Sequence, residues 1–202
     1  MLTSLDEWLT AFVLKVIPTA WQPNHITAAR ILLIPVVWAL YYNVSPFAAT
    51  AMFASLALTD FVDGRLARGR GIVTASGKLL DIGCDLMLVW STVTLLWKEH
   101  IILSEQNPAV YWSLVIIFAR EIIVTAVRLS FEVKAADVRV LKVGKCKTGF
   151  FMVGLGVLLT SSVWVYGIAV GTAFLVFAAA CSLISGVQYV QQLTILAQGK
   201  DE

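Results

Sequence analysis

Residues 60–85 read DFVDGRLARGRGIVTASGKLLDIGCD, and this stretch decides the fold because it places four aspartates between and within apolar runs. Two of them, Asp60 and Asp63, follow one apolar run, and the other two, Asp81 and Asp85, begin the next. A carboxylate inside a membrane span costs about 2.5 to 3.5 kcal/mol on insertion scales, so four in neighbouring spans require partners. The stretch therefore predicts two membrane helices that share a polar site.

The spacing of the aspartates predicts that each pair lies on one helix face. Asp60 and Asp63 are three positions apart, and Asp81 and Asp85 are four apart, which is close to one helical turn in both cases. Two antiparallel helices joined by a short loop can bring the four carboxylates together, where they repel one another unless cations neutralise them. Ligation by oxygen alone, without histidine or thiolate, favours Mg²⁺ or Mn²⁺ over zinc. The sequence therefore predicts a divalent-metal site.

The residues around the aspartates suit a phosphate ligand. Gly64, Ala67 and Gly77 lack bulk, so a ligand can approach the helix backbones closely. Arg68 can bind a phosphate through two parallel hydrogen bonds. The alternative is that the carboxylates only pair with basic residues at the helix ends, which explains single pairs but not the whole pattern. We therefore expect a pyrophosphate group beside the metal site.

The composition of the whole chain is that of a membrane protein. Hydrophobic residues make up 59% of the 202 residues and charged residues 14%, which is too apolar for a surface in water. A span needs about 20 apolar residues, so this length allows about six helices with short connections. The expected fold is all-α, a single polytopic membrane domain over residues 1–202.

Six apolar runs support this count and form a predicted transmembrane core over residues 26–190. Residues 2–17 place apolar and charged positions at helical spacing, which predicts an amphipathic helix lying in the membrane interface. The six predicted spans are 26–42, 47–68, 77–97, 110–131, 150–166 and 169–190.

The basic residues predict the orientation of the spans. If the N-terminus is cytoplasmic, 14 of the 15 Lys and Arg residues lie in cytoplasmic segments or helix ends, and Lys98 alone lies outside. The positive-inside rule prefers this arrangement. Both termini and the four aspartates are then expected on the cytoplasmic side. The net charge of +2, with its basic residues scattered, argues against nucleic-acid binding.

The cysteines and histidines indicate no further metal site. Cys84, Cys146 and Cys181 form no CxxC pair and are expected to be reduced packing residues. His25 and His100 have no companions at zinc-ligand spacing and are expected to be interface residues.

Taken together, the aspartates and their neighbours resemble the signature of the CDP-alcohol phosphatidyltransferase family, with every defining position filled. The matching string is Asp60-xx-Asp63-Gly64-xx-Ala67-Arg68, eight further residues, and Gly77-xxx-Asp81-xxx-Asp85. The resemblance implies a six-helix fold, usually dimeric, in which two divalent metals and the CDP moiety lie among these residues.

The same resemblance implies a role for each signature residue. Asp60, Asp63 and Asp81 would ligate the metals, and Asp85 would complete the metal site and act as general base. The implied contacts to CDP-diacylglycerol are Asp63, Gly64, Ala67, Arg68 and Gly77. Direct displacement fits these residues, because Asp85 can take the proton of the acceptor hydroxyl while CMP departs. A covalent phosphatidyl-enzyme is not favoured, since no Ser or Cys with an adjacent base stands out.

Three further stretches resemble the phosphatidylglycerophosphate synthases within this family. They are residues 24–30, 118–128 and 144–148. The implied acceptor is glycerol 3-phosphate, which gives phosphatidylglycerol phosphate and CMP from CDP-diacylglycerol, in a bacterial inner membrane. The chain departs from the subfamily pattern at Ile82, Cys84 and Leu86, where proline, a small residue and lysine would stand.

Basic residues on the fourth predicted span and just before the fifth suit the phosphate of that acceptor. Glu121 and Arg128 are seven apart, on one helical stripe, and Arg120 is adjacent in angle. The predicted acceptor-phosphate residues are Arg120, Arg128, Lys145 and Lys147. The alternative is topological, because basic residues on the cytoplasmic side that snorkel to the interface produce a similar pattern.

Other functions remain open from the sequence. The acceptor could be inositol phosphate, serine or choline in the same type of reaction. A cation-coupled or proton-coupled transporter also carries acidic residues in its spans, although its site should lie nearer the bilayer midplane.

Overall fold

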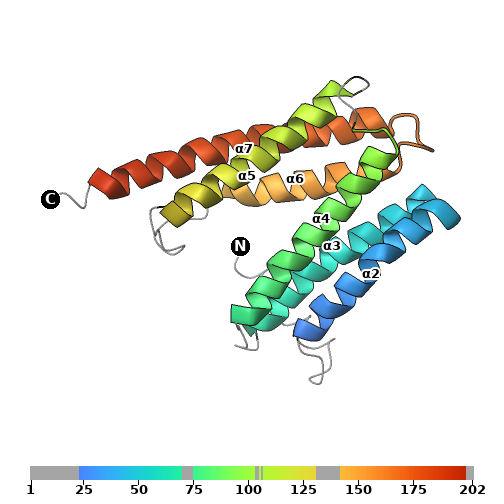
Figure 1. The fold of residues 1–202 in the computed structure, drawn as a ribbon, viewed down its shortest axis with the longest axis horizontal. Coiled ribbons are helices and arrows are strands. Elements are labelled where there is room, and N and C mark those ends of the chain that lie inside the picture. The colour runs from blue at the N-terminus through green and yellow to red at the C-terminus, as the bar shows by residue number, and fades with distance from the viewer. Residues whose placement is uncertain (1–22, 70–74, 103–104, 106, 131–141, 199–202) are drawn as a thin grey trace, which may run out of the picture. The chain divides into compact units, whose positions relative to one another are not determined.

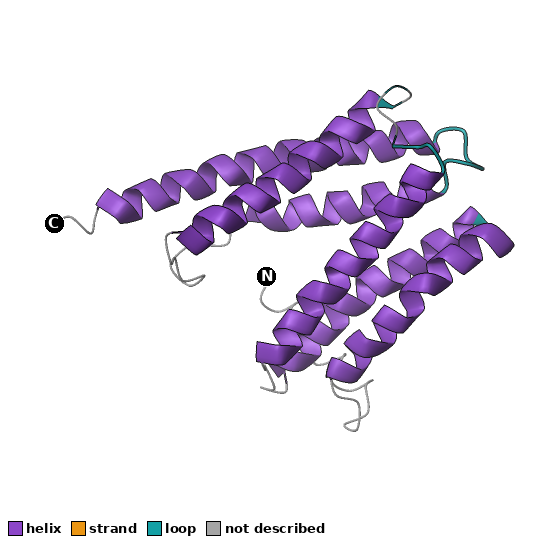
Figure 2. Cartoon of the chain, in the orientation of Figure 1, coloured by secondary structure: helices purple, strands orange, loops and turns teal. Residues whose placement is uncertain are grey.

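The structure is a computed structural model that describes residues 23–69, 75–102, 105, 107–130 and 142–198. Side chains are described over 27–59, 83–102, 105, 107–126 and 146–191. Within these ranges the chain is helical with short turns and contains no strand (Figure 2). The predicted all-α class is confirmed for them. The predicted interfacial helix, residues 2–17, lies outside the described residues.

Most predicted spans correspond to helices with slightly wider bounds. The described helices are α2 Pro23–Asn43, α3 Pro46–Gly69, α4 Ala75–Lys98, α5 Pro108–Ser130, α6 Lys142–Leu159 and α7 Gly167–Gln198. Two of them show how the sequence starts a helix. Ser45 accepts a hydrogen bond at Oγ from the backbone N–H of Ala48, 3.1 Å away, and Pro46 takes the first helical position of α3. Asn107 precedes Pro108 at the start of α5, where its backbone carbonyl accepts from the N–H groups of Val110 and Tyr111 at 3.1 and 3.2 Å.

The contacts divide the chain into two compact units, residues 1–95 and 96–202. In the first unit α2 packs against α3 (Figure 1), and apolar side chains fill the contact. Its buried residues include Val37, Tyr41, Phe53 and Leu56. α4 is tied to α2 by a hydrogen bond from Trp38 Nε1 to Ser91 Oγ at 2.8 Å. Polar as well as apolar contacts therefore hold this unit together.

In the second unit α5 and α6 both pack against α7. Glycines allow α6 and α7 to approach closely. A Cβ added at Gly171 would lie 2.7 Å from Leu158 Cγ, and one added at Gly154 would lie 2.9 Å from Leu175 Cδ2. Since contacts below 3.0 Å are sterically excluded, larger residues at these positions would push the helices apart.

The predicted fifth span, 150–166, is wrong in its bounds. α6 begins eight residues earlier and ends at Leu159. Thr160 then bonds locally: its N–H and its hydroxyl both donate to the carbonyl of Val157, at 3.0 and 2.7 Å. Such local bonds compete with the helical pattern, so the apolar residues after Thr160 form turns rather than another helical turn. Apolar composition alone could not reveal this end.

Much of the apolar surface of the helices is not covered by protein. Among the residues searched, Pro108–Ala126 and Gly167–Gln191 are long and apolar enough to cross a membrane, yet only 28% and 33% of their windows are buried. A core helix of a water-soluble domain would bury most of its residues. Shorter apolar segments occur at Thr27–Asn43, Pro46–Thr59 and Cys146–Leu159. The described helices are therefore consistent with a membrane protein.

Candidate active site

The four aspartates occupy the helices that the sequence predicted. Asp60 and Asp63 lie in the final turns of α3, and Asp81 and Asp85 lie in the first turns of α4. Residues 70–74 join the two helices, so the ends of α3 and α4 can be at most about 22 Å apart. The side chains of 60–82 are outside the described set. The predicted roles of Asp60, Asp63 and Asp81, and of Gly64, Ala67, Arg68 and Gly77, therefore remain predictions.

Asp85 is described, and it forms an ion pair with an arginine on α2. Arg30 Nη1 donates to Asp85 Oδ1 over 3.3 Å, between residues 55 positions apart in the sequence. The Arg30 side chain is 0% exposed, and that of Asp85 is 40% exposed. A fully buried arginine requires a charged or hydrogen-bonding partner, because an unpaired buried charge is strongly unfavourable. The pair therefore anchors a carboxylate that still reaches the surface.

Arg30 has a role that its sequence position did not reveal. The distribution of basic residues predicted only that Arg30 is one of those on the cytoplasmic side, yet its side chain is buried against Asp85. It also provides a positive charge beside Asp85, which matters because Leu86, at the position of the expected lysine, is exposed and apolar. In the sequence, only its place in the stretch 24–30, which resembles the phosphatidylglycerophosphate synthases, indicated that Arg30 could have a further role.

The donor set of the four aspartates fits a hard divalent cation. Carboxylate oxygens are the ligands that Mg²⁺ and Mn²⁺ prefer. Within the described side chains no group of three acidic, histidine or cysteine residues could hold a metal. None of the three cysteines, all within the described residues, forms a disulfide. Cys84 is buried, as expected for a packing residue, and Cys181 is partly buried, but Cys146 is exposed, so the packing prediction is wrong for Cys146. The fit thus rests on the chemistry of the aspartates and on their helical positions.

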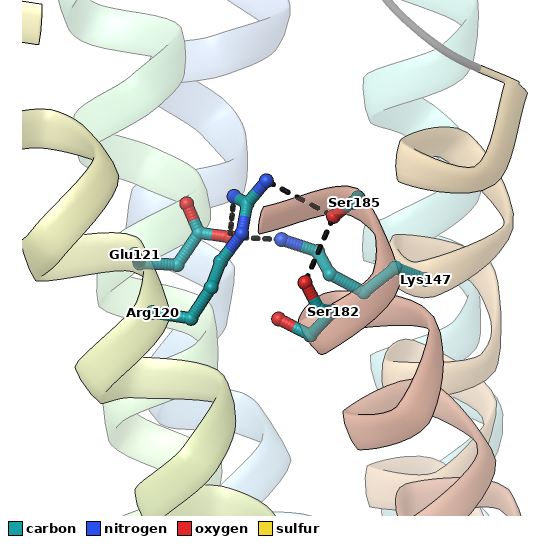
Figure 3. A network of polar contacts seen from close by, with 5 residues as sticks. All are labelled: Arg120, Glu121, Lys147, Ser182 and Ser185. Carbon is teal, nitrogen blue, oxygen red and sulfur yellow. Dashed lines mark hydrogen bonds and ion pairs between the residues drawn. The ribbon is translucent and has the colours of Figure 1, made fainter. Parts of the chain in front are cut away.

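A second polar cluster lies between α5, α6 and α7 in the second unit (Figure 3). Arg120 Nη1 donates to Glu121 Oε1 at 3.2 Å, and Arg120 Nη2 donates to Ser185 Oγ at 3.0 Å. Lys147 Nζ donates to the same Glu121 oxygen. Two of the predicted acceptor-phosphate residues, Arg120 and Lys147, are therefore neighbours around one carboxylate.

The charges of this cluster differ in exposure. The side chains of Arg120 and Lys147 are 17% and 12% exposed, whereas that of Glu121 is 44% exposed. Two largely covered cations thus share a carboxylate that lies nearer the solvent. An anion entering this site would meet the cations where the carboxylate now lies.

The other two predicted acceptor-phosphate residues are placed only by their helices. Arg128 belongs to the last turn of α5, and Lys145 belongs to the first turn of α6. Because α6 begins at Lys142, Lys145 and Lys147 are helical residues, although both precede the predicted fifth span, 150–166.

Sequence analysis missed the contribution of α7. Ser185 is buried, and its hydroxyl both accepts from Arg120 and donates to the carbonyl of Ser182 at 3.0 Å. Gly186 lies near the arginine, and a Cβ added there would be 3.4 Å from Arg120 Cγ, an ordinary van der Waals distance. The only signal was the small polar pair Ser182 and Ser185, one turn apart in an apolar helix, with Gly186 beside it.

Comparison with known proteins covers both units. Residues 20–184 match the model of the CDP-alcohol phosphatidyltransferase family. A Rickettsia bellii protein named CDP-diacylglycerol–glycerol-3-phosphate 3-phosphatidyltransferase is 33% identical over 173 residues, which is 83% of this chain and 92% of the relative. Proteins of the same name from Pseudomonas fluorescens and Shigella flexneri are 36% and 35% identical over 179 and 174 residues. These alignments cover 84% and 83% of this chain, and 88% and 92% of the respective relatives.

Proposed function

Since the chain belongs to the CDP-alcohol phosphatidyltransferase family, we propose that it transfers a phosphatidyl group from CDP-diacylglycerol to glycerol 3-phosphate. The products are phosphatidylglycerol phosphate and CMP. The names of the similar proteins support this donor and this acceptor. The observation that carries the acceptor is the clustering of Arg120 and Lys147, two covered cations held together around one exposed carboxylate.

The nucleotide side of the reaction is assigned to the α3–α4 stretch. Asp60, Asp63, Asp81 and Asp85 would hold Mg²⁺ or Mn²⁺, two ions by family resemblance, and enzymes of this family generally depend on divalent metals. When bound, the metal neutralises charge on the pyrophosphate and on departing CMP. The residues that would bind CDP-diacylglycerol are Asp63, Gly64, Ala67, Arg68 and Gly77.

Asp85 is the residue assigned to proton transfer. Its side chain is exposed enough to meet a substrate hydroxyl, and Arg30 holds one of its oxygens in place. The acceptor oxygen forms a bond to the donor phosphorus, the bond from that phosphorus to CMP breaks, and the hydroxyl proton passes to Asp85. Family membership favours this chemistry over the transporter that the acidic residues alone left open.

The acceptor phosphate is assigned to Arg120, Arg128, Lys145 and Lys147. A phosphate dianion needs more than one cation, and an arginine can bind it through two parallel hydrogen bonds. Serine, choline and glycerol carry no phosphate, so these cations would add little to the binding of such acceptors. Inositol phosphate would use the same cations, and it is the alternative acceptor that this site leaves open.

The setting of the reaction is a membrane, because this family is membrane-associated and the described helices expose apolar surface. The finer arrangement is part of the proposal: six spans in one domain, an interfacial helix over 2–17, and a homodimer in a bacterial inner membrane. The basic residues support cytoplasmic placement of both termini and of the aspartates.

The test is CMP release from CDP-diacylglycerol by the purified protein with a panel of acceptors. We expect glycerol 3-phosphate to be preferred and free glycerol to be poor. Arg120→Ala should raise the KM for glycerol 3-phosphate at least about tenfold, because each lost charge-assisted hydrogen bond contributes about 1.5 to 3 kcal/mol. Preference for serine, choline or glycerol would refute the phosphate assignment.

The same assay tests the metal requirement. Activity should vanish in excess EDTA and return when Mg²⁺ or Mn²⁺ is added. Full turnover in EDTA would mean that the four aspartates do not act as metal ligands.

A further inference from the structure

The guanidinium of Arg120 is fixed by a residue on another helix. Ser185 donates its hydroxyl proton to the carbonyl of Ser182, which points an oxygen lone pair toward Arg120 Nη2. A hydroxyl carries one proton and two lone pairs, so both contacts can be made at once. Ser185 is buried, and therefore its hydroxyl does not exchange these partners for bulk water. Its orientation is set before any ligand arrives.

The arginine stem also passes near α7. Gly186 follows Ser185, and a Cβ built on it would lie 3.4 Å from Arg120 Cγ and 3.6 Å from Nε. These are ordinary van der Waals distances for a Cβ, so the space between this glycine and the Arg120 stem could hold a methyl group. The contact that fixes the arginine on α7 is therefore the hydrogen bond to Ser185.

We propose that Ser185 is a positioning residue for the acceptor: it holds Arg120 in the orientation in which the guanidinium receives the phosphate of glycerol 3-phosphate. This inference rests on the proposed function, because it assigns Arg120 to that phosphate. It adds a residue on α7 that makes no contact with the substrate and acts through Arg120.

The exposure of the partners explains why Ser185, rather than Glu121, sets the bound geometry. Glu121 is the exposed member of the cluster, and an entering phosphate would compete with it for Arg120 Nη1 and Lys147 Nζ. The contact from Arg120 Nη2 to Ser185 is on the covered side and can persist when phosphate binds. The serine therefore restrains Arg120 when the carboxylate no longer does, which reduces the ordering required on binding.

The experiment compares Ser185→Ala with Ser113→Ala in the full-length enzyme. Ser113 on α5 is a matched control, because it is equally buried and also donates to a carbonyl of its own helix, that of Ala109 at 2.6 Å. Ser185→Ala should raise the KM for glycerol 3-phosphate about fivefold or more, through loss of one hydrogen bond to a charged group. The kcat and the KM for CDP-diacylglycerol should stay within about twofold, since neither depends on that bond. Ser113→Ala should leave all three unchanged.

Two further variants separate positioning from packing. Ser185→Thr keeps the hydroxyl and should recover most of the wild-type KM. In an Arg120→Ala background, Ser185→Ala should raise the KM no further, because the residue through which it acts is gone.

Specific results would overturn the inference. A wild-type KM in Ser185→Ala, an equal rise in Ser113→Ala, or a further rise in the Arg120→Ala background would each refute it while leaving glycerol 3-phosphate as the acceptor. If the wild-type enzyme instead uses an acceptor without phosphate, the proposed function fails and the inference fails with it.

Discussion

The pair formed by Arg30 and Asp85 makes a prediction at the scale of single residues. If Arg30 holds Asp85 for proton transfer, Arg30→Gln should lower kcat about 10-fold to 100-fold, the size expected for one charge-assisted hydrogen bond. The KM values for both substrates should change little. Steady-state kinetics on the purified variant measures this directly.

A matched control comes from another hydrogen bond between the same helices. Trp38→Phe removes the bond to Ser91 without touching Asp85, so it should lower thermal stability with only a small change in kcat. Equal loss of kcat in both variants would assign Arg30 to helix packing rather than to Asp85. A second check is Arg30→Gln in an Asp85→Asn background, where no additional loss of kcat is expected.

The aspartates themselves should differ in what their loss affects. Asp85→Asn should lower turnover about 10²-fold to 10⁴-fold, as for other general bases, while CDP-diacylglycerol binding is largely kept. Asp63→Asn and Asp81→Asn should weaken metal binding as well, because these two are assigned as metal ligands and not as the general base. Calorimetric metal titration of the three variants distinguishes the roles. Equal loss of metal affinity in all three would remove the separate role of Asp85.

At this scale the sequence predicted the spacing of charged residues better than it predicted which residues they contact. The spacing of four aspartates and the motif around Arg120 are visible in one dimension, because they repeat at helical intervals. The ion pair of Arg30 with Asp85 and the hydrogen bond of Arg120 to Ser185 cannot be seen in the sequence, since each joins residues more than fifty positions apart. Serine in an apolar helix usually bonds its own backbone, so only the neighbouring Ser182 and Gly186 distinguish Ser185 from Ser113 in the sequence.

At the scale of helices, glycines make the next prediction. A Cβ at Gly167 would lie 2.7 Å from the backbone Cα of Ser161, which cannot move aside as a flexible side chain can. Gly167→Ala should therefore lower stability by about 1 to 3 kcal/mol through overpacking. The measurement is the midpoint of thermal unfolding in detergent.

Gly149 on α6 is the matched control, because nothing lies within 4 Å of a Cβ added there. Gly149→Ala should be neutral or slightly stabilising, since alanine favours a helix by about 0.5 to 1 kcal/mol over glycine. If both alanine variants unfold at the wild-type temperature, the close approach of Gly167 to Ser161 has no bearing on stability.

Helix existence was predictable, and helix ends were less so. Hydrophobic runs identified all six described helices, but the bounds of α6 and the C-terminal extension of α7 depended on other features. Residues 142–147, which include three lysines, belong to α6 because lysine is compatible with a helix. The charge of lysine opposes burial in lipid and does not oppose helix formation. The local bonds of Thr160 then end α6.

At the scale of the whole molecule, the distribution of basic residues makes a topological prediction. In a background without the native cysteines, single cysteines at Ser4 and Lys200 should react with a membrane-impermeant reagent only from the cytoplasmic side. A cysteine at Gln106 should react only from the opposite side. Any other pattern would move the aspartates away from the cytoplasmic face.

The prediction of one domain over 1–202 remains a prediction. The family match runs from residue 20 to 184 and includes most of both compact units. The boundary between the units falls inside α4, between Leu95 and Leu96. Composition could predict a membrane protein of this size, but it contains no information about how a chain divides into packed groups.

The burial of Arg30 also has a consequence for biosynthesis. Its partner is 55 residues further along the chain, so at about 5 to 20 residues per second the ribosome needs roughly 3 to 11 s to supply it. If α2 spans the membrane as proposed, an unpaired arginine in it costs up to about 2.5 to 3.5 kcal/mol, the value for the centre of a span. We therefore expect α2 to stay beside the translocon until α4 emerges, and the two helices to enter the lipid together.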